Sequence, residues 1–216
     1  MKTIIEHALV VTVNDQNEVI EDGSLVIEDQ RLRYVGPVSQ APTGPFDHVI
    51  DGRRMIAMPG LINAHCHSPA NIHRGLLPGR PLEIWRAYWR SMLRVMNGED
   101  LYISALLGAA EMLKTGTTTV LDHYFGNQDL PFMGAGEAIR AMRDLGLRHV
   151  VALTLSDRRY EETLPLGDQM GSASSEIQQI TKSETQDAHR WLEICEKFIA
   201  EHHDPDRLTT CNNNFF

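Results

Sequence analysis

The sequence is poor in cysteine, with only Cys66, Cys195 and Cys211 among its 216 residues. An odd and sparse set of this kind does not form a disulfide framework, so a reducing, cytoplasmic compartment is the simpler expectation. No Cys-x-x-Cys pair is present in the sequence. This argues against a zinc site built from cysteine pairs.

The sequence also lacks a long apolar run and an excess of basic residues. No stretch approaches the roughly 20 apolar residues that a membrane helix needs. The apolar N-terminus is interrupted by Glu6 and His7 and has no small-residue cleavage site, so we interpret it as a strand and not as a signal peptide. The formal net charge of -9 disfavours nucleic acid and anionic membranes as partners.

The first 58 residues have the pattern of β structure. Residues 4–13 predict one strand, and two β-rich runs on either side of the polar residues 28–30 predict a hairpin. Glycine and proline interrupt the region repeatedly, and no helical period fits it. We therefore expect this segment to be all-β.

After Pro59 the pattern changes to an alternation of strands and helices. Short apolar or β-branched runs predict strands over residues 60–65, 117–125 and 147–155, and the start of another at 207–210. Helical spacing of apolar residues predicts helices over residues 82–96, 100–114, 135–145 and 183–202. Such alternation is typical of parallel βα units, which places the chain in the α/β class.

Two histidines, His65 and His67, lie at the end of the first of these strands. Alternate side chains of a strand point to the same face, so both imidazoles project in one direction and Cys66 points away into the core. Two neighbouring imidazoles are a natural start of a zinc or iron site, and the C-terminal end of a barrel strand faces the catalytic mouth. A bare His-x-His pair also arises by chance, so the interpretation depends on its surroundings.

Those surroundings resemble the amidohydrolase superfamily. A β-rich start is followed by Pro59-Gly60, an apolar strand and the His-x-His pair. The segments NIHRGL (71–76) and PLEIW (81–85) are similar to the branch that holds triazine hydrolases and adenosine-, guanine- and cytosine-type deaminases. The segments 114–122 and 146–148 fit the second and third strands of that branch. The resemblance extends to about Leu208.

The resemblance implies a small N-terminal β-sandwich portion over residues 1–58. An incomplete (β/α)8 TIM-type barrel, its first half with strands 1 to 4, would follow over residues 59–208. Residues 209–216 fit no strand or helix pattern and are expected to be an unrelated tail. The resemblance also implies one divalent metal ion, zinc or alternatively iron, bound by His65 and His67. The remaining ligands and the catalytic residues are expected beyond the end of this chain.

The same resemblance implies a metal-dependent hydrolase that acts through metal-activated water on a small heteroaromatic substrate. The expected reaction is hydrolysis of a non-peptide C–N bond, as in deamination of a cyclic amidine, or of a C–Cl bond. We expect low activity from half a barrel, and a homo-oligomer would be in keeping with the family. A cyclic amide hydrolase of the hydantoinase or imidazolonepropionase type is the alternative enzyme. A nonfunctional remnant or an interaction module is the non-enzymatic alternative.

Three further residues are candidate substrate contacts. Asn71 resembles a position of the branch and is expected to brace the loop. Trp85 lies four residues before Trp89 on a predicted helix, so either ordinary packing or an aromatic wall for a flat ring explains it. His123 either points into the mouth or packs in the core. Adenosine-type deaminases of the branch carry a glutamate near the position of Arg94, and this departure weakens the nucleoside deaminase interpretation.

Overall fold

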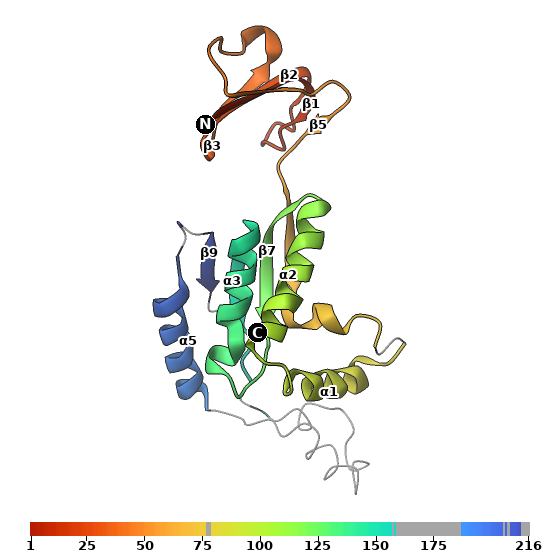
Figure 1. Cartoon of the computed structure of the whole chain (residues 1–216), viewed down its shortest axis with the longest axis vertical. Helices are drawn as coiled ribbons and strands as arrows, with labels where there is room; N and C mark the ends of the chain where they lie inside the picture. The colour runs from red at the N-terminus through yellow and green to blue at the C-terminus, as the bar shows by residue number, and fades with distance from the viewer. Residues whose placement is uncertain (77–78, 157, 159–186, 205, 207, 213–216) are drawn as a thin grey trace, which may run out of the picture. The chain divides into compact units, whose positions relative to one another are not determined.

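The computed structural model describes residues 1–76, 79–156, 158, 187–204, 206 and 208–212. The chain forms two compact units, Met1–Gly60 and Leu61–Phe216, each with its own sheet (Figure 1). The boundary therefore falls directly after the Pro59-Gly60 pair, two residues later than the sequence pattern placed it.

The first unit is a single five-stranded sheet. Its strands are β1 (Lys2–Val11), β2 (Val19–Glu28), β3 (Arg31–Pro37), β4 (His48–Asp51) and β5 (Ile56–Ala57), with the short 3-10 segment η1 (Val38–Gln40) after β3. The order is β3-β2-β1-β4, and β5 also pairs with β1. The β2–β3 hairpin confirms the prediction, with Asp29 in its turn at a φ of 55°. All five described strands of residues 1–60 belong to one sheet, and its place in a β-sandwich stays a prediction.

The second unit contains a four-stranded parallel sheet in the order β6-β7-β8-β9. Its strands are β6 (Leu61–Cys66), β7 (Thr117–Tyr124), β8 (Arg148–Leu153) and β9 (Thr209–Asn212). Its helical segments are η2 (Ser68–His73), α1 (Leu82–Leu93), α2 (Gly98–Lys114), η3 (Pro131–Gly134), α3 (Ala135–Leu145) and α5 (Ala188–His202). The predicted βα alternation is confirmed.

The strand β9 is the strand whose start the sequence predicted at residues 207–210, and it corrects the expectation that residues 209–212 fit no strand pattern. Thr209 pairs with His149 of β8, and the His149 amide donates to the Leu208 carbonyl at 2.8 Å. Thr209 is fully buried, and Cys211 is buried in the core. The sequence indicates only the start of this strand, and pairing with β8 extends it to Asn212. Residues 213–216 lie outside the described part of the chain.

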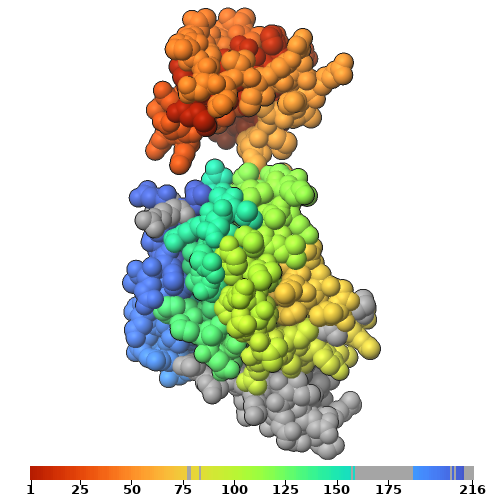
Figure 2. Space-filling model, in the orientation of Figure 1, coloured from red at the N-terminus to blue at the C-terminus, as the bar shows by residue number. Residues whose placement is uncertain are grey.

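The core of the second unit lies between the sheet and the helices α2, α3 and α5, which pack on β7, β8 and β9 (Figure 1). The largest fully buried side chains there are Leu101, Val120, Tyr124, Ile139, Met142, Leu147, Val151 and Phe198. The helices α2 and α3 lie side by side (Figure 2), where the Tyr102 hydroxyl donates to Asp144 at 2.8 Å. In contrast, Ile62 of β6 is 73% exposed. None of the described helices is both long and apolar enough to cross a bilayer.

The helix α1 ends at Leu93, three residues before the predicted end, because a new helix start follows it at once. The Asn97 side chain accepts hydrogen bonds from the Glu99 and Asp100 amides, and the Asp100 carboxylate accepts from the Asn97 amide. This capping box begins α2 at Gly98. The cap stabilises the turn that carries the chain from α1 to α2.

Candidate metal centre

The rings of His65 and His67 lie side by side at the C-terminal end of β6. Their centroids are 4.8 Å apart with an interplanar angle of 86°. The two rings therefore project from the strand together, as the alternation of side chains requires. Cys66 points away from them and packs against the core, and burial raises the pKa of its thiol.

A bulge at Asn63 shapes this end of β6. The pairing register with β7 shifts between Asn63 and Cys66, and the Asn63 carboxamide oxygen accepts a hydrogen bond from the His65 amide at 3.1 Å. The Asn63 amide nitrogen contacts the Met112 sulfur of α2 at 3.6 Å. Bulges of this kind re-aim side chains at strand ends. Sequence reasoning gave Asn63 no role, since a bulge has no periodic signal.

The tautomer of His67 follows from its hydrogen bond. His67 Nδ1 lies 2.7 Å from the backbone oxygen of His123, and a carbonyl oxygen can only accept, so Nδ1 carries the proton. The Nε2 atom therefore keeps its lone pair. Metal-binding histidines commonly donate their other ring N–H to a carbonyl or carboxylate in this way, which fixes the ring and its tautomer.

His123, at the C-terminal end of β7, brings a third imidazole to the pair. Its ring centroid lies 4.7 Å from that of His65 and 6.2 Å from that of His67, and the residue is 9% exposed. Burial, together with the two neighbouring histidines, lowers the pKa of His123. A lowered pKa keeps this imidazole neutral at neutral pH. Among the described residues, however, no group of three or more potential ligands is arranged to hold an ion.

Trp89, and not Trp85, is the tryptophan beside the histidines. The Trp89 centroid lies 5.8 Å from that of His67, and the Trp85 centroid lies 5.7 Å from that of Trp89 with the two rings tilted by 56°. Phe125 flanks Trp89 on another side at 5.9 Å. Trp89 is 6% exposed, whereas Trp85 is partly buried against the core. The spacing of the two tryptophans predicted that they pack on the same face of the helix, but not which ring would lie next to His67.

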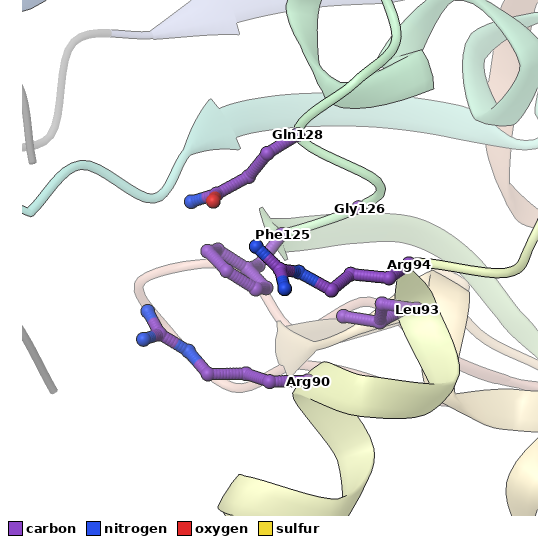
Figure 3. Close-up of a pocket in the computed structure, with 6 residues that line it drawn as sticks. All are labelled: Arg90, Leu93, Arg94, Phe125, Gly126 and Gln128. Carbon is purple, nitrogen blue, oxygen red and sulfur yellow. The ribbon is translucent and has the colours of Figure 1, made fainter. Parts of the chain in front are cut away.

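A small pocket adjoins this aromatic group (Figure 3). It is lined by Arg90, Leu93, Arg94, Phe125, Gly126 and Gln128. The Arg90 guanidinium lies 4.8 Å from the Phe125 ring centroid, a cation–π distance. Arg94, at the position where the branch's adenosine-type deaminases carry a glutamate, contributes a second cation to the lining.

Asn71 lies within η2, and its side chain packs against α2. Its side-chain amide donates to the Ser68 carbonyl at 3.1 Å and occupies the space where a Cβ on Gly108 would lie. This contact braces the loop after His67, as the sequence suggested. A substrate contact by Asn71 remains a prediction.

Asp122 and His149 form a buried pair behind the histidines. Both side chains are 0% exposed, and His149 Nε2 lies 3.3 Å from one carboxylate oxygen of Asp122. The other oxygen accepts the Ser68 amide at 3.0 Å. The sequence alone assigned no role to either residue. The available signal in the sequence was one polar residue inside each of two runs that predict strands, Asp122 in the first and His149 in the second.

A family model described as the amidohydrolase family matches residues 56–205. The 5-methylthioadenosine/S-adenosylhomocysteine deaminase of Syntrophomonas wolfei is 35% identical over 154 residues, which covers 70% of this chain and 33% of that protein. The protein of the same name from Nitratidesulfovibrio vulgaris Hildenborough is 41% identical over 125 residues, covering 56% of this chain and 28% of its own. The chain thus spans about a third of the length of these curated relatives.

Solved structures with the same fold include two hydrolases bound to zinc. An atrazine chlorohydrolase from Arthrobacter aurescens superposes with a TM-score of 0.74 at 23% identity, over 98% of this chain and 46% of that one. An adenosine deaminase from Xanthomonas campestris superposes with a TM-score of 0.68 at 24% identity, over 98% of this chain and 42% of that one. At these identities the likeness extends to the fold alone.

Proposed function

The chain belongs to the amidohydrolase family, and we propose that it provides the first two metal ligands, His65 and His67, of a hydrolase that deaminates a small heteroaromatic ring. The observation that carries the proposal is the hydrogen bond from His67 Nδ1 to the His123 carbonyl. It leaves Nε2 of His67 as a lone-pair donor beside the His65 ring, which is the arrangement that a divalent ion requires.

Zinc is the proposed ion, and iron is the alternative. Imidazole nitrogen suits both metals, and the partly buried Cys66 thiol points away from the site. When bound, the ion supplies the Lewis acidity that makes water a nucleophile near neutral pH. Two imidazoles do not complete such a site, so we propose that the chain is the first four strands of a (β/α)8 barrel. The exposed side chain of Ile62 on β6 is consistent with a sheet face that further barrel elements would cover.

The chain's own residues have distinct roles in this proposal. His65 and His67 bind the ion, and the neutral His123 imidazole beside them contacts the substrate or accepts a proton from it. Trp89, with Trp85 behind it, forms an aromatic wall against which a flat ring packs. This combination of a metal centre, a neutral base and an aromatic wall suits hydrolytic attack on a heteroaromatic carbon.

Deamination is placed first because the curated relatives, which share 35% and 41% identity with this chain, are named as deaminases of 5-methylthioadenosine and S-adenosylhomocysteine. Hydrolysis of a C–Cl bond is the second candidate. It is kept because Arg94, which lines the pocket beside Phe125, lies near the position where the branch's adenosine-type deaminases carry a glutamate, and this departure weakens the nucleoside deaminase interpretation.

Metal binding tests the proposal directly. Zinc affinity of the purified chain is measured by competition with a chromophoric chelator, for the parent and for His65→Gln, His67→Gln and His48→Gln. The exposed His48 of the first unit is the matched control. We expect the first two variants to lose at least the roughly 10- to 100-fold typical of a weakened metal site, and the control to lose nothing. Equal affinities in all four proteins would contradict the proposal.

The substrate class needs a complete enzyme. Residues 1–212 would replace the equivalent segment of the Syntrophomonas wolfei deaminase, and ammonia release from 5-methylthioadenosine and chloride release from atrazine would be measured. We expect ammonia release that His67→Gln abolishes. Chloride release without ammonia release would transfer the proposal to the second candidate.

A further inference from the structure

Asp122 lies on the opposite face of β7 from the histidine rings. It is flanked in sequence by Leu121 and His123, and it shares the buried, helix-facing side of the strand with Val120 and Tyr124. Its carboxylate is 0% exposed. A carboxylate is expensive to bury unless hydrogen bonds satisfy it, so its partners indicate its use.

The partners of Asp122 lead directly to the metal-binding loop. One oxygen accepts the backbone N–H of Ser68, which is the residue after His67. The next residue of β7, His123, accepts the ring N–H of His67 through its backbone carbonyl. Two consecutive residues of β7 therefore hold the His67–Ser68 junction. Asp122 bonds the backbone amide of Ser68, and His123 bonds the imidazole of His67.

His149 of β8 forms a hydrogen bond with the second oxygen of Asp122. Its Nε2 lies 3.3 Å from that oxygen, and since a carboxylate accepts, Nε2 carries the proton. The hydrogen bonds of Asp122 thus connect three neighbouring strands, from His149 on β8 through β7 to Ser68 just after β6. Ser104 of α2 adds a bond from its hydroxyl to the Ser68 carbonyl at 2.8 Å, so both backbone polar groups of Ser68 are bonded.

We propose that Asp122 is a positioning residue for the metal centre, which fixes the backbone after His67 so that the His67 ring meets the His123 carbonyl and presents Nε2. The inference rests on the proposed metal site, but the tautomer of His67 is observable without metal. Its central consequence is that removing the Asp122 carboxylate releases the His67 ring, whereas removing equal packing nearby does not.

The test compares Asp122→Ala and Asp122→Asn with Val120→Ala in the full chain. Val120 is fully buried on the same face of the same strand. Val120→Ala therefore removes core packing but leaves the hydrogen bond between Asp122 and the Ser68 amide in place. Asp122→Asn keeps an oxygen that accepts the Ser68 amide. Unfolding is measured for each variant, and all spectra are recorded at a temperature where each is folded.

The first readout is the ring tautomer of His67 from long-range ¹H–¹⁵N correlation spectra without metal, with His67→Gln used for assignment. We expect the Nδ1–H form in the parent, Asp122→Asn and Val120→Ala. In Asp122→Ala we expect a shift toward the Nε2–H form that an unrestrained imidazole prefers. An unchanged tautomer in Asp122→Ala, or an equal change in Val120→Ala, would overturn the inference.

The second readout is zinc affinity. Loss of an outer partner typically weakens a metal site by about 10- to 100-fold, so we expect that loss in Asp122→Ala and less than about threefold loss in the other two variants. A parent chain that binds no zinc would count against the proposed metal site, while the tautomer would still decide the role of Asp122. The two failures are therefore distinguishable.

Discussion

The side-chain amide of Asn71 fills the space above Gly108 on α2. A Cβ built on Gly108 would overlap the Asn71 amide nitrogen, so α2 approaches η2 more closely than any residue with a side chain allows. The same Asn71 amide donates to the Ser68 carbonyl, one residue after His67. This contact thus links the packing of α2 to the geometry of the metal centre.

Gly108→Ala is expected to destabilise the second unit by about 1–3 kcal/mol, the usual cost of overpacking. The matched control is Gly136→Ala on α3, where the new Cβ would meet only the His202 ring, at 3.4 Å or more. There the better helix propensity of alanine is expected to stabilise by up to about 1 kcal/mol. Urea unfolding of both variants checks the opposite signs. Two changes of the same sign would contradict the packing argument.

Replacement of His149 tests the buried pair energetically. His149→Leu leaves one oxygen of a fully buried carboxylate without its donor, and breaking a buried pair in this way costs about 3–5 kcal/mol. His149→Gln retains an N–H donor and is expected to recover a large part of that loss. Chemical denaturation ranks the variants as parent, glutamine, then leucine. A leucine variant as stable as the parent would show that the hydrogen bond contributes nothing.

His202 makes stability sensitive to acid. Burial against Phe198 and Phe132 lowers its pKa from the ordinary value of 6.5. Because the pKa is lower in the folded state, the unfolded chain binds more protons as the pH falls below about 6.5, and folding loses free energy there. Above that pH His202 is neutral in both states, and the folded state keeps its full stability. In His202→Gln the stability should fall less steeply between pH 6.5 and 5, as measured by urea unfolding, with exposed His48→Gln as the control.

Metal is expected to stabilise the folded chain. An ion that binds only the folded state raises the melting temperature, and the increase grows with the logarithm of the free ion concentration above the dissociation constant. Added zinc should therefore raise the melting temperature of the parent, and a chelator should reverse the increase. His67→Gln should not respond to zinc. A response that persists in the variant would place the bound ion elsewhere in the chain.

Much of the fold was predictable because its signals are local. The apolar spacing of α2 and the β-branched run of β7 predicted those elements within two residues of their observed bounds. The end of α1 was missed because the Asn97 cap begins the next helix at once. The start of β9 was predicted at residues 207–210, but its continuation to Asn212 was not, because a strand this short has no clear period and depends on the neighbouring strand.

By itself, the sequence determined that two imidazoles project together from the end of a strand, since strand geometry alternates side chains whatever surrounds them. It also determined the alternation of strands and helices that places this strand in a parallel sheet. Only the tertiary structure decided that His67 is held as the Nδ1–H tautomer, that Asp122 bonds the Ser68 amide, and that Trp89 is the adjacent aromatic ring. The partners in those two hydrogen bonds are 56 and 54 residues apart in the chain, and no short-range pattern encodes a contact over such a separation.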